Sequence, residues 1–197
     1  MSRELDEILE IYTNRWVRIE PDFGDRFVEI DLGCGKGGFL LQLAERYPER
    51  QIIGVDVMIG RLRRVAKKIR NRGLDNAMLW RCGGAELSSY LLPDNSIDRI
   101  HILNPDPWPK EKHRARRLVQ SEFLGRLRSK LKIGGVLHLS TDDAPYFAFM
   151  GDAIRELPFY ESDPEAIADI EDLKTDFELE YLAEGKPVPH VAFRRVR

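Results

Sequence analysis

The stretch EIDLGCGKGGF, residues 29–39, joins a short apolar run to an amphipathic one. The run FVEIDL, Phe27 to Leu32, is typical of a buried strand, and FLLQLAERY, from Phe39, has apolar residues at helical spacing. Glycines between a strand and a helix let the backbone pass close to a ligand, and the helix N-terminus offers free N–H groups. The stretch therefore predicts a ligand-binding loop within an alternating α/β fold.

Strands and helices alternate along the rest of the chain. Further strands are predicted at residues 51–57, 76–81, 97–103 and 135–141, and helices at residues 4–12, 61–72, 117–131 and after Asp143. Near the C-terminus, ELEYL (178–182) and HVAFRRV (190–196) flank EGKPVP, which is typical of a hairpin. This order predicts an α/β, Rossmann-like doubly wound sheet of seven strands, mostly parallel with a C-terminal antiparallel hairpin.

Composition narrows the class of protein. A length of 197 residues suggests one domain, and the net charge of −2 excludes a molecule that is basic overall. Charge is nevertheless uneven, because residues 61–72 carry seven cations and no acid, whereas residues 161–184 hold ten acids and one lysine. Cys34 and Cys82 form no CxxC pair, so neither a disulfide framework nor a metal site is expected. No signal or membrane segment is visible, and we expect a cytoplasmic protein.

The glycine loop is compatible with two classes of ligand. Gly33, Gly35 and Gly38 satisfy the GxGxxG pattern of dinucleotide-binding loops, whereas Gly33, Gly35 and Gly37 satisfy the GxGxG form of methyltransferases that use S-adenosylmethionine. Asp56 ends the second strand and would bind a ribose in either case. The acids Glu29 and Asp31 would repel a pyrophosphate but favour an ammonium and a sulfonium, which supports S-adenosylmethionine. A turn without any ligand is the remaining alternative.

The stretch LNPDPWPKEKHRARR, residues 103–117, follows the fourth strand at the edge where such sheets bind ligands. Its prolines fix a turn that presents Asp106 and Trp108, a carboxylate and a ring suited to a planar heterocycle. The alternative is a turn that only precedes the next helix. The adjacent cations suit the phosphates of a nucleic acid, although such a run is commonly a solvated face: Lys110, Lys112, Arg114, Arg116 and Arg117.

These motifs resemble the tRNA (guanine-N7-)-methyltransferase family over residues 27–195. EIDLGCGKGGFL and GVDV are similar to its first two motifs, and NPDPWPKEKHRARRLVQSEFL is the most specific stretch. LHLSTDDAPY resembles the segment with the family's Thr-Asp pair, and TDFE, residues 175–178, resembles its short C-terminal motif. The resemblance implies a methyltransferase domain over residues 27–197 after a helical extension over residues 1–26.

The resemblance also implies roles for residues. Asp106 would be catalytic, and the cofactor would be bound by Glu29, Gly33, Gly35, Gly37, Asp56, Gly84 and Asp106. The tRNA substrate would be bound by Lys110, Asp142, Thr175, Asp176, Phe177 and Glu178. Two of these have alternatives from the residues themselves: Asp142 as the N-cap of the following helix, and Glu178 as a solvated acid of an acidic tail.

The chain departs from the family pattern at two places. Gly84 stands where the family has an Asp or Asn that reaches the adenine, so contacts there would come from backbone, Glu86 or water. The N-terminal arm is also short and has few cations, and an accessory subunit is one way to replace it. The chain itself would be a monomer or a homodimer.

Guanine N7 carries a lone pair and no proton, so its methylation needs alignment rather than a general base. Asp106 is therefore expected to orient the guanine by accepting from N1–H and N2–H, a role that Asp142 or Glu178 would also suit. The sequence leaves three alternative functions: a methyltransferase for an exocyclic amine or another RNA, a catalytically silent RNA-binding homologue, and a nicotinamide dehydrogenase.

Overall fold

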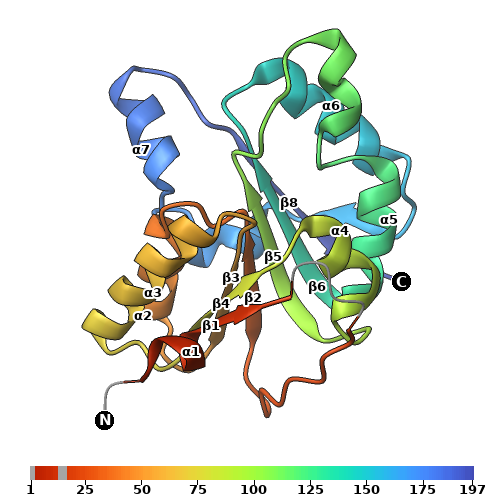
Figure 1. Cartoon of the computed structure of the whole chain (residues 1–197). Coiled ribbons are helices and arrows are strands. Elements are labelled where there is room, and N and C mark those ends of the chain that lie inside the picture. Colours follow the sequence, from red (N-terminus) through yellow and green to blue (C-terminus); the bar gives the residue numbers. More distant parts are fainter. Residues whose placement is uncertain (1–2, 13–16) are drawn as a thin grey trace.

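The five consecutive buried residues of β2 (Val28–Leu32) form a central strand of a mixed sheet. The computed structural model describes residues 3–12 and 17–197. Its sheet has eight strands in the order β1-β4-β3-β2-β5-β6-β8-β7 (Figure 1). The other strands are β1 (Leu9–Ile11), β3 (Gln51–Val55), β4 (Ala77–Arg81), β5 (Ile97–Leu103), β6 (Leu131–Ser140), β7 (Tyr160–Ser162) and β8 (His190–Arg195).

Strand directions confirm the predicted fold class. The pairs from β1 through β6 are all parallel, and β8 runs antiparallel to both of its neighbours, β6 and β7. Two strands were not predicted: β1, which pairs with β4 at one edge of the sheet, and β7, which pairs with β8 at the other. The helix predicted over residues 4–12 is therefore wrong beyond α1 (Leu5–Ile8), because the chain becomes extended at Leu9. The remaining N-terminal residues 1–2 and 13–16 lie outside the described part.

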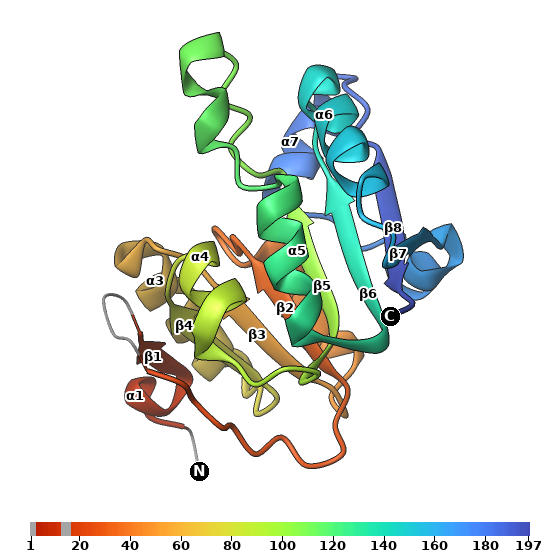
Figure 2. The ribbon, with the colours of Figure 1, turned by 90° about the vertical axis from the view of Figure 1, so that its right-hand side faces the viewer.

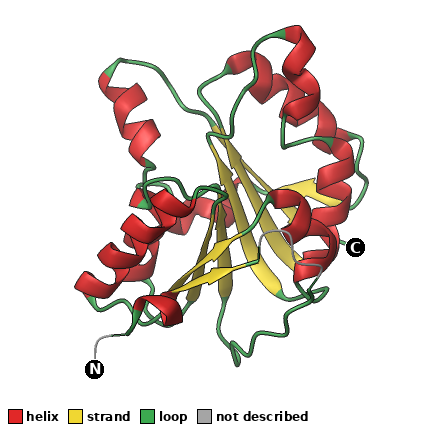
Figure 3. Ribbon diagram, in the orientation of Figure 1, coloured by secondary structure: helices red, strands yellow, loops and turns green. Residues whose placement is uncertain are grey.

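Helices cover both faces of the sheet (Figure 3). Apolar residues of α2 (Gly38–Arg46) and α3 (Ile59–Arg72) pack on one face in a buried cluster that includes Leu40, Leu43, Leu62 and Val65. The other face packs against α5 (Ser121–Lys130) and α6 (Ala144–Arg155). Shorter elements are α4 (Gly84–Glu86), the π-helical η1 (Leu87–Leu91), and the 3₁₀ helices η2 (Glu111–Arg116) and η3 (Pro164–Ile170).

The predicted C-terminal hairpin is wrong in one strand. ELEYL lies in α7 (Asp176–Ala183), and β8 instead pairs with β6 and with the unpredicted β7. The helix begins at Thr175, whose Oγ1 accepts a hydrogen bond from the Glu178 amide at 3.0 Å. That cap satisfies an N–H group which would otherwise lack a partner at the helix start.

The arrangement creates a crevice at the carboxyl ends of β2 and β5. The helices that follow β2 and β3 cover one face, and those that follow β5 and β6 cover the other, so the connections diverge between β2 and β5. The segment after β5, with η2, projects beyond this edge of the sheet (Figure 2). Within residues 3–12 and 17–197, none of the helices combines the length and the apolar character needed to cross a bilayer.

Candidate cofactor and substrate site

A cavity of about 530 Å³ lies at the carboxyl ends of β2, β3, β4 and β5. It brings together five of the residues predicted to bind the cofactor, Gly33, Gly35, Asp56, Gly84 and Asp106. The rest of its wall is formed by Leu32, Val55, Val57, Met58, Arg61, Cys82, Leu103, Asn104, Pro105, Trp108, Arg116, Leu118 and Phe177. Residues from four strand ends therefore meet in one place, as the order of the motifs predicts.

The glycine loop has a backbone that other residues would adopt only with strain. Gly33, Gly35 and Gly37 have φ values of 90°, 54° and 81°. The amides of Gly33 and Cys34 both donate to the Val55 carbonyl, at 2.7 and 3.0 Å, which ties the loop to β3. A Cβ added to Gly33 would meet no atom within 4 Å, whereas one added to Gly37 would lie 2.7 Å from Val65. Gly33 thus faces open space, and Gly37 allows close packing against α3.

Glu29 does not lie at the loop, which corrects its predicted role as a cofactor ligand. Its fully buried carboxylate accepts from Arg50 at 2.6 Å and contacts His101 at 2.9 Å. Burial would raise the pKa of Glu29, but His101 and the two arginines Arg99 and Arg50 together hold it below its ordinary value. The carboxylate beside the glycines belongs instead to Asp31, two residues further along β2.

Three carboxylates surround the glycine loop. Asp31 and Asp176 line a small cavity of about 30 Å³ with Gly33 and Phe177, and Asp56 lines the larger one. Burial, followed by the charges of Asp56 and Asp176, raises the pKa of Asp31 to about 7. The negative charges of such a cluster repel an anion and attract a cation. Buried carboxylates also disfavour one another's ionisation, so a positive group that joins them stabilises their charged form.

Asp56 also organises the loop backbone. Its two carboxylate oxygens accept from the amides of Gly35 at 3.2 Å and Met58 at 2.7 Å. Arg61 of α3 lies 3.8 Å from the same carboxylate and is partly exposed. The residue is thus held rigidly at the cavity wall, where a ribose hydroxyl would find an acceptor.

The proline turn is held by backbone and side-chain contacts. Asn104 and Trp108 have positive φ values of 49° and 43°. The Asn104 amide donates to the Ser140 carbonyl at 2.9 Å, and its side-chain Nδ2 donates to Thr175 Oγ1 at 3.0 Å. Its Oδ1 is buried and has no hydrogen-bond partner among the residues that the structure describes. Asp106 is exposed at the cavity wall, so the turn presents a carboxylate and leaves one buried acceptor free to bind a ligand.

The cations after the turn divide into two groups. Lys110, Lys112, Arg114 and Arg116 are exposed on or beside η2, and the Arg116 guanidinium lies 5.0 Å from the Trp108 ring centroid. Arg117 is only 4% exposed, and its Nε donates to the Pro107 carbonyl at 2.8 Å. The prediction that Arg117 contacts phosphate is therefore wrong, because its guanidinium is enclosed by the turn and α6.

The four residues of the C-terminal motif TDFE, residues 175–178, do not all lie at the glycine loop. Thr175, Asp176 and Phe177 lie beside the glycine loop, and Asp176 accepts from the Gly38 amide at 3.0 Å. Glu178 is buried and paired with Lys174 and His190 at 3.0 Å each, so it is neither a solvated acid nor a cavity-lining residue.

Asp142 is half-buried near the end of β6. The N-cap of α6 is its neighbour Asp143, which accepts from the Tyr146 amide at 2.7 Å. The capping alternative for Asp142 is thus wrong, and its side chain remains available as a ligand-binding candidate.

Gly84 lies at the cavity wall, where the neighbouring side chains leave no room for a Cβ. A Cβ at this position would lie 2.8 Å from Leu118 Cδ1 and 3.3 Å from the Phe123 ring. Glu86, a possible substitute ligand for the adenine, turns back and accepts from the Gly83 amide at 2.7 Å. The backbone at Gly84 is therefore the part of this segment that faces the cavity.

The chemistry of the wall fits S-adenosylmethionine and does not fit a pyrophosphate. Asp31 and Asp56 suit a cationic centre and a ribose, and the unpaired Asn104 Oδ1 offers an acceptor to an ammonium. Cys34 and Cys82 are free and buried, and burial followed by Glu86 raises the pKa of Cys82 to about 12, which keeps it protonated rather than nucleophilic. Among the described residues no three His, Cys, Asp or Glu side chains are placed to hold a metal ion.

Comparison with known proteins gives consistent results. A family described as "Putative methyltransferase" matches residues 25–189. A tRNA (guanine-N(7)-)-methyltransferase of Pseudomonas syringae pv. syringae is 35% identical over 83% of this chain and 69% of its own length. One of Marinobacter nauticus is 39% identical over 64% of this chain and 53% of its own length. The chain thus spans between about half and two thirds of the length of such relatives.

Solved structures share the fold. The crystal structure of the 16S rRNA methyltransferase KamB superposes with a TM-score of 0.63 at 15% identity, covering 89% of this chain and 95% of that one. Identity at this level supports the architecture alone.

Proposed function

This chain belongs to the tRNA (guanine-N7-)-methyltransferase family, and from that premise we propose that it transfers a methyl group from S-adenosylmethionine to N7 of a guanine in tRNA. The observation that carries the proposal is the meeting, in one cavity, of the acid-lined glycine loop and the rigid turn that bears Asp106. One wall suits a cationic cofactor, and the facing wall suits a purine.

The cofactor would be held by this chain's acids and backbone. S-adenosylmethionine supplies an electrophilic methyl group on a sulfonium. Asp31 and the free oxygen of Asn104 would hold the amino-acid end, and Asp56 would accept from the ribose. The backbone at Gly84 would face the adenine. Asp31 replaces Glu29 in this set because only Asp31 reaches the loop.

Asp106 would orient the guanine. N7 attacks with its own lone pair, so the protein needs to supply alignment and no base. Asp106 is exposed on a turn with little conformational freedom, where it can accept from N1–H and N2–H on the edge opposite N7. Trp108, beneath the Arg116 guanidinium, offers a ring for stacking. Burial of Glu178 removes it from this role, and Asp142 remains the second candidate for the guanine edge.

Two groups of exposed cations would bind the tRNA backbone. One group lies on and beside η2 and comprises Lys110, Lys112, Arg114 and Arg116. The other lies along the outer face of α3 and includes Arg63, Arg64, Lys67 and Lys68. Neutralising several phosphates releases counterions, so the affinity for tRNA should fall steeply as salt rises.

The test is incubation of the protein with labelled S-adenosylmethionine and unmodified total tRNA, followed by nucleoside analysis. We expect 7-methylguanosine. Methylation of an exocyclic amine instead would replace the proposed nucleophile, and absence of both transfer and thermal stabilisation by the cofactor would indicate a silent RNA-binding homologue.

Replacement of Asp106 by Asn tests the orienting role. A carboxylate can accept from N1–H and N2–H through its two oxygens, whereas an amide has one acceptor oxygen. Turnover should therefore fall by about 10²-fold or more, with cofactor binding largely retained. Asp75→Asn is the matched control, because Asp75 is an exposed acid between α3 and β4, at the opposite edge of the sheet. Equal loss of turnover and of cofactor binding in Asp106→Asn would show that Asp106 chiefly holds the cofactor.

A further inference from the structure

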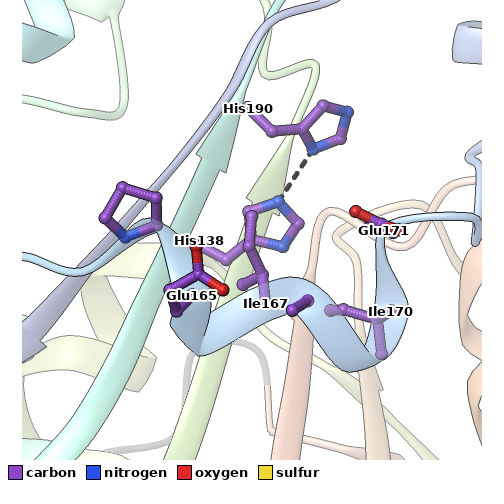
Figure 4. Close-up of a pocket in the computed structure, with 8 residues that line it drawn as sticks. His138, Glu165, Ile167, Ile170, Glu171 and His190 are labelled. Carbon is purple, nitrogen blue, oxygen red and sulfur yellow. Dashed lines mark hydrogen bonds between the residues drawn. The ribbon is translucent and has the colours of Figure 1, made fainter.

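Three buried or half-buried histidines form a continuous hydrogen-bonded chain between two glutamates. His101 Nε2 lies 2.9 Å from Glu29, and its Nδ1 lies 2.9 Å from Nδ1 of His138. His138 Nε2 lies 2.8 Å from Nδ1 of His190, a contact marked by the dashed line in Figure 4. His190 Nε2 lies 3.0 Å from Glu178. This histidine chain crosses the sheet from β2 through β5, β6 and β8 to α7.

The geometry fixes the number of protons in the histidine chain. Each of its four contacts needs one proton between two heavy atoms. A neutral imidazole carries one N–H group and an ionised carboxylate carries none, so three neutral rings supply one proton too few. With both glutamates ionised, one ring must therefore be an imidazolium.

Surroundings decide which ring carries the additional proton. Burial would raise the pKa of Glu29 and of Glu178, but His101 and two arginines outweigh it at the first and His190 with Lys174 at the second, so both carboxylates stay ionised. Burial lowers the pKa of His101, and burial followed by His101 and His190 lowers that of His138 well below its ordinary value. His138 has an imidazole on both sides, so neither of its ring nitrogens contacts a carboxylate.

His190 is the most exposed ring and has a carboxylate partner. Its side chain is 19% exposed, whereas that of His101 is fully buried. The groups that face it are His138 of β6, Glu178 of α7, Lys174, and the acids Glu165 and Glu171. Those two acids line, with His138 and His190, a cavity of about 350 Å³ along η3 that gives the end of the histidine chain access to solvent (Figure 4).

We propose that His190 carries the additional proton as an imidazolium and is a positioning residue for methyl transfer, since it fixes Glu178 and with it the start of α7. In the same turn of α7, Thr175 contacts Asn104 and Asp176 contacts the Gly38 amide. Phe177 lines the two cavities at the glycine loop. Loss of the proton would leave two facing acceptors at one of the contacts of His190, either with the Glu178 carboxylate or with Nε2 of His138. Because facing acceptors repel, the ring that holds Glu178 would be loosened. The positioning part rests on the proposed function, whereas the proton count does not.

The proton count is tested by ¹⁵N–¹H NMR of the imidazole rings in the whole protein near neutral pH. The chain has only four histidines, and His113→Asn removes the signal of the one outside the histidine chain. We expect one imidazolium, assigned to His190, with His101 protonated on Nε2 and His138 on Nδ1. Three neutral rings, or an imidazolium on His101 or His138, would overturn the assignment.

Glu178→Gln should keep the four contacts of the histidine chain while removing the need for the additional proton. The introduced amide nitrogen can donate to a neutral His190. Lys174 can then donate to the amide oxygen, which takes the position of Oε2, an atom without a partner among the described residues of the wild type. All four contacts are then satisfied by three neutral rings, so the imidazolium signal should disappear while the tautomers of His101 and His138 persist. Glu165→Gln is the matched control, because it removes a charge at the same cavity without a place in the histidine chain, and its spectrum should match that of the wild type.

The positioning role is tested by the pH dependence of methyl transfer. In the wild type and in Glu165→Gln, turnover should fall on the alkaline side, with the same midpoint as the loss of the imidazolium signal in the NMR spectrum. In Glu178→Gln that alkaline fall should be absent, whatever the absolute rate. An unchanged alkaline fall in Glu178→Gln would overturn the positioning role, and absence of any methyl transfer in the wild type would overturn the proposed function while leaving the NMR result to be judged alone.

Discussion

Arg117 donates from Nε to the Pro107 carbonyl at 2.8 Å while its guanidinium lies 4.7 Å from the ring centroid of Tyr146. A second ring of α6, that of Phe149, lies 5.1 Å from the same group. The buried Arg117 thus connects the turn that presents Asp106 to helix α6. Its function is to support the turn, since the enclosed guanidinium cannot reach a phosphate.

Arg117→Gln should therefore act on turnover and stability. Loss of the hydrogen bond and of two cation–π contacts should destabilise the fold by about 1–3 kcal/mol. The loosened turn should lower turnover by about 10-fold or more, because small misplacements of an aligning group are costly. Chemical denaturation and steady-state kinetics measure the two effects.

Arg114→Gln is the contrasting variant. Arg114 is exposed, and within the described part of the chain its ion pair is with Glu111 at 3.2 Å, so its loss should leave stability nearly unchanged. If it contacts a phosphate, the slope of log affinity for tRNA against log salt should drop by about 0.7–0.9. A reduced slope in Arg117→Gln, or an unchanged one in Arg114→Gln, would reverse the two assignments.

The contrast between these arginines shows where sequence reasoning stops. Residues 110–117 have no periodicity that distinguishes a buried cation, because the aromatic partners of Arg117 come from a helix about 30 residues later. The strands β2 to β6 were predictable since each is an apolar run bounded by turn residues. Glu29 and Asp31 share one face of β2, because side chains alternate along a strand. Only the short separation of Asp31 from Gly33 in the sequence indicates which of the two acids lies beside the glycine loop.

The error at α7 has a different cause. The alternation in ELEYL matches a strand, but Thr175-x-x-Glu178 is the pattern of a helix start, and the cap at Thr175 confirms that start. The histidine chain was beyond prediction, since its three rings are brought together only by the strand order β5-β6-β8. Long-range pairing, rather than local propensity, accounts for what the sequence did not reveal.

Gly84→Asn should lower stability rather than improve cofactor binding. The added Cβ would lie 2.8 Å from Leu118 Cδ1, and relief of such overpacking typically costs about 1–3 kcal/mol. Leu118→Ala in the same chain should recover part of this loss, because it removes the atom that the introduced side chain would strike. A thermal-melt double-mutant cycle measures the coupling, and strictly additive losses would contradict the steric explanation.

Gly38→Ala should weaken the contact between α7 and the glycine loop. A Cβ at this position would lie 2.6 Å from Asp176 Oδ2, so the carboxylate must leave the Gly38 amide. We expect affinity for S-adenosylmethionine to fall by about 10-fold, roughly the value of one charge-assisted hydrogen bond. Titration calorimetry measures this change.

Gly60→Ala provides the control for that substitution. Gly60 also lies in a first helical turn, but a Cβ there meets no atom within 4 Å. It should stabilise the protein by about 0.4–1 kcal/mol and leave cofactor affinity unchanged. Equal affinities in the two alanine variants would show that the contact of Asp176 with the loop does not matter for binding.

Ionisation of Asp31 should make cofactor affinity depend on pH. Burial, followed by Asp56 and Asp176, raises the pKa of Asp31 from 3.8 to about 7 in the folded protein. The folded chain therefore keeps a proton that the unfolded chain has already lost, and the free protein should lose stability as pH rises from 3.8 to about 7. A cationic ligand favours the ionised carboxylate, so its affinity should rise over the upper part of the same range and level off above about 7. Calorimetry in buffers of different ionisation enthalpy should detect a proton released on binding below that pH. Asp31→Asn should bind more weakly and lose both the pH dependence and the proton release, whereas retention of either would place the titrating group elsewhere.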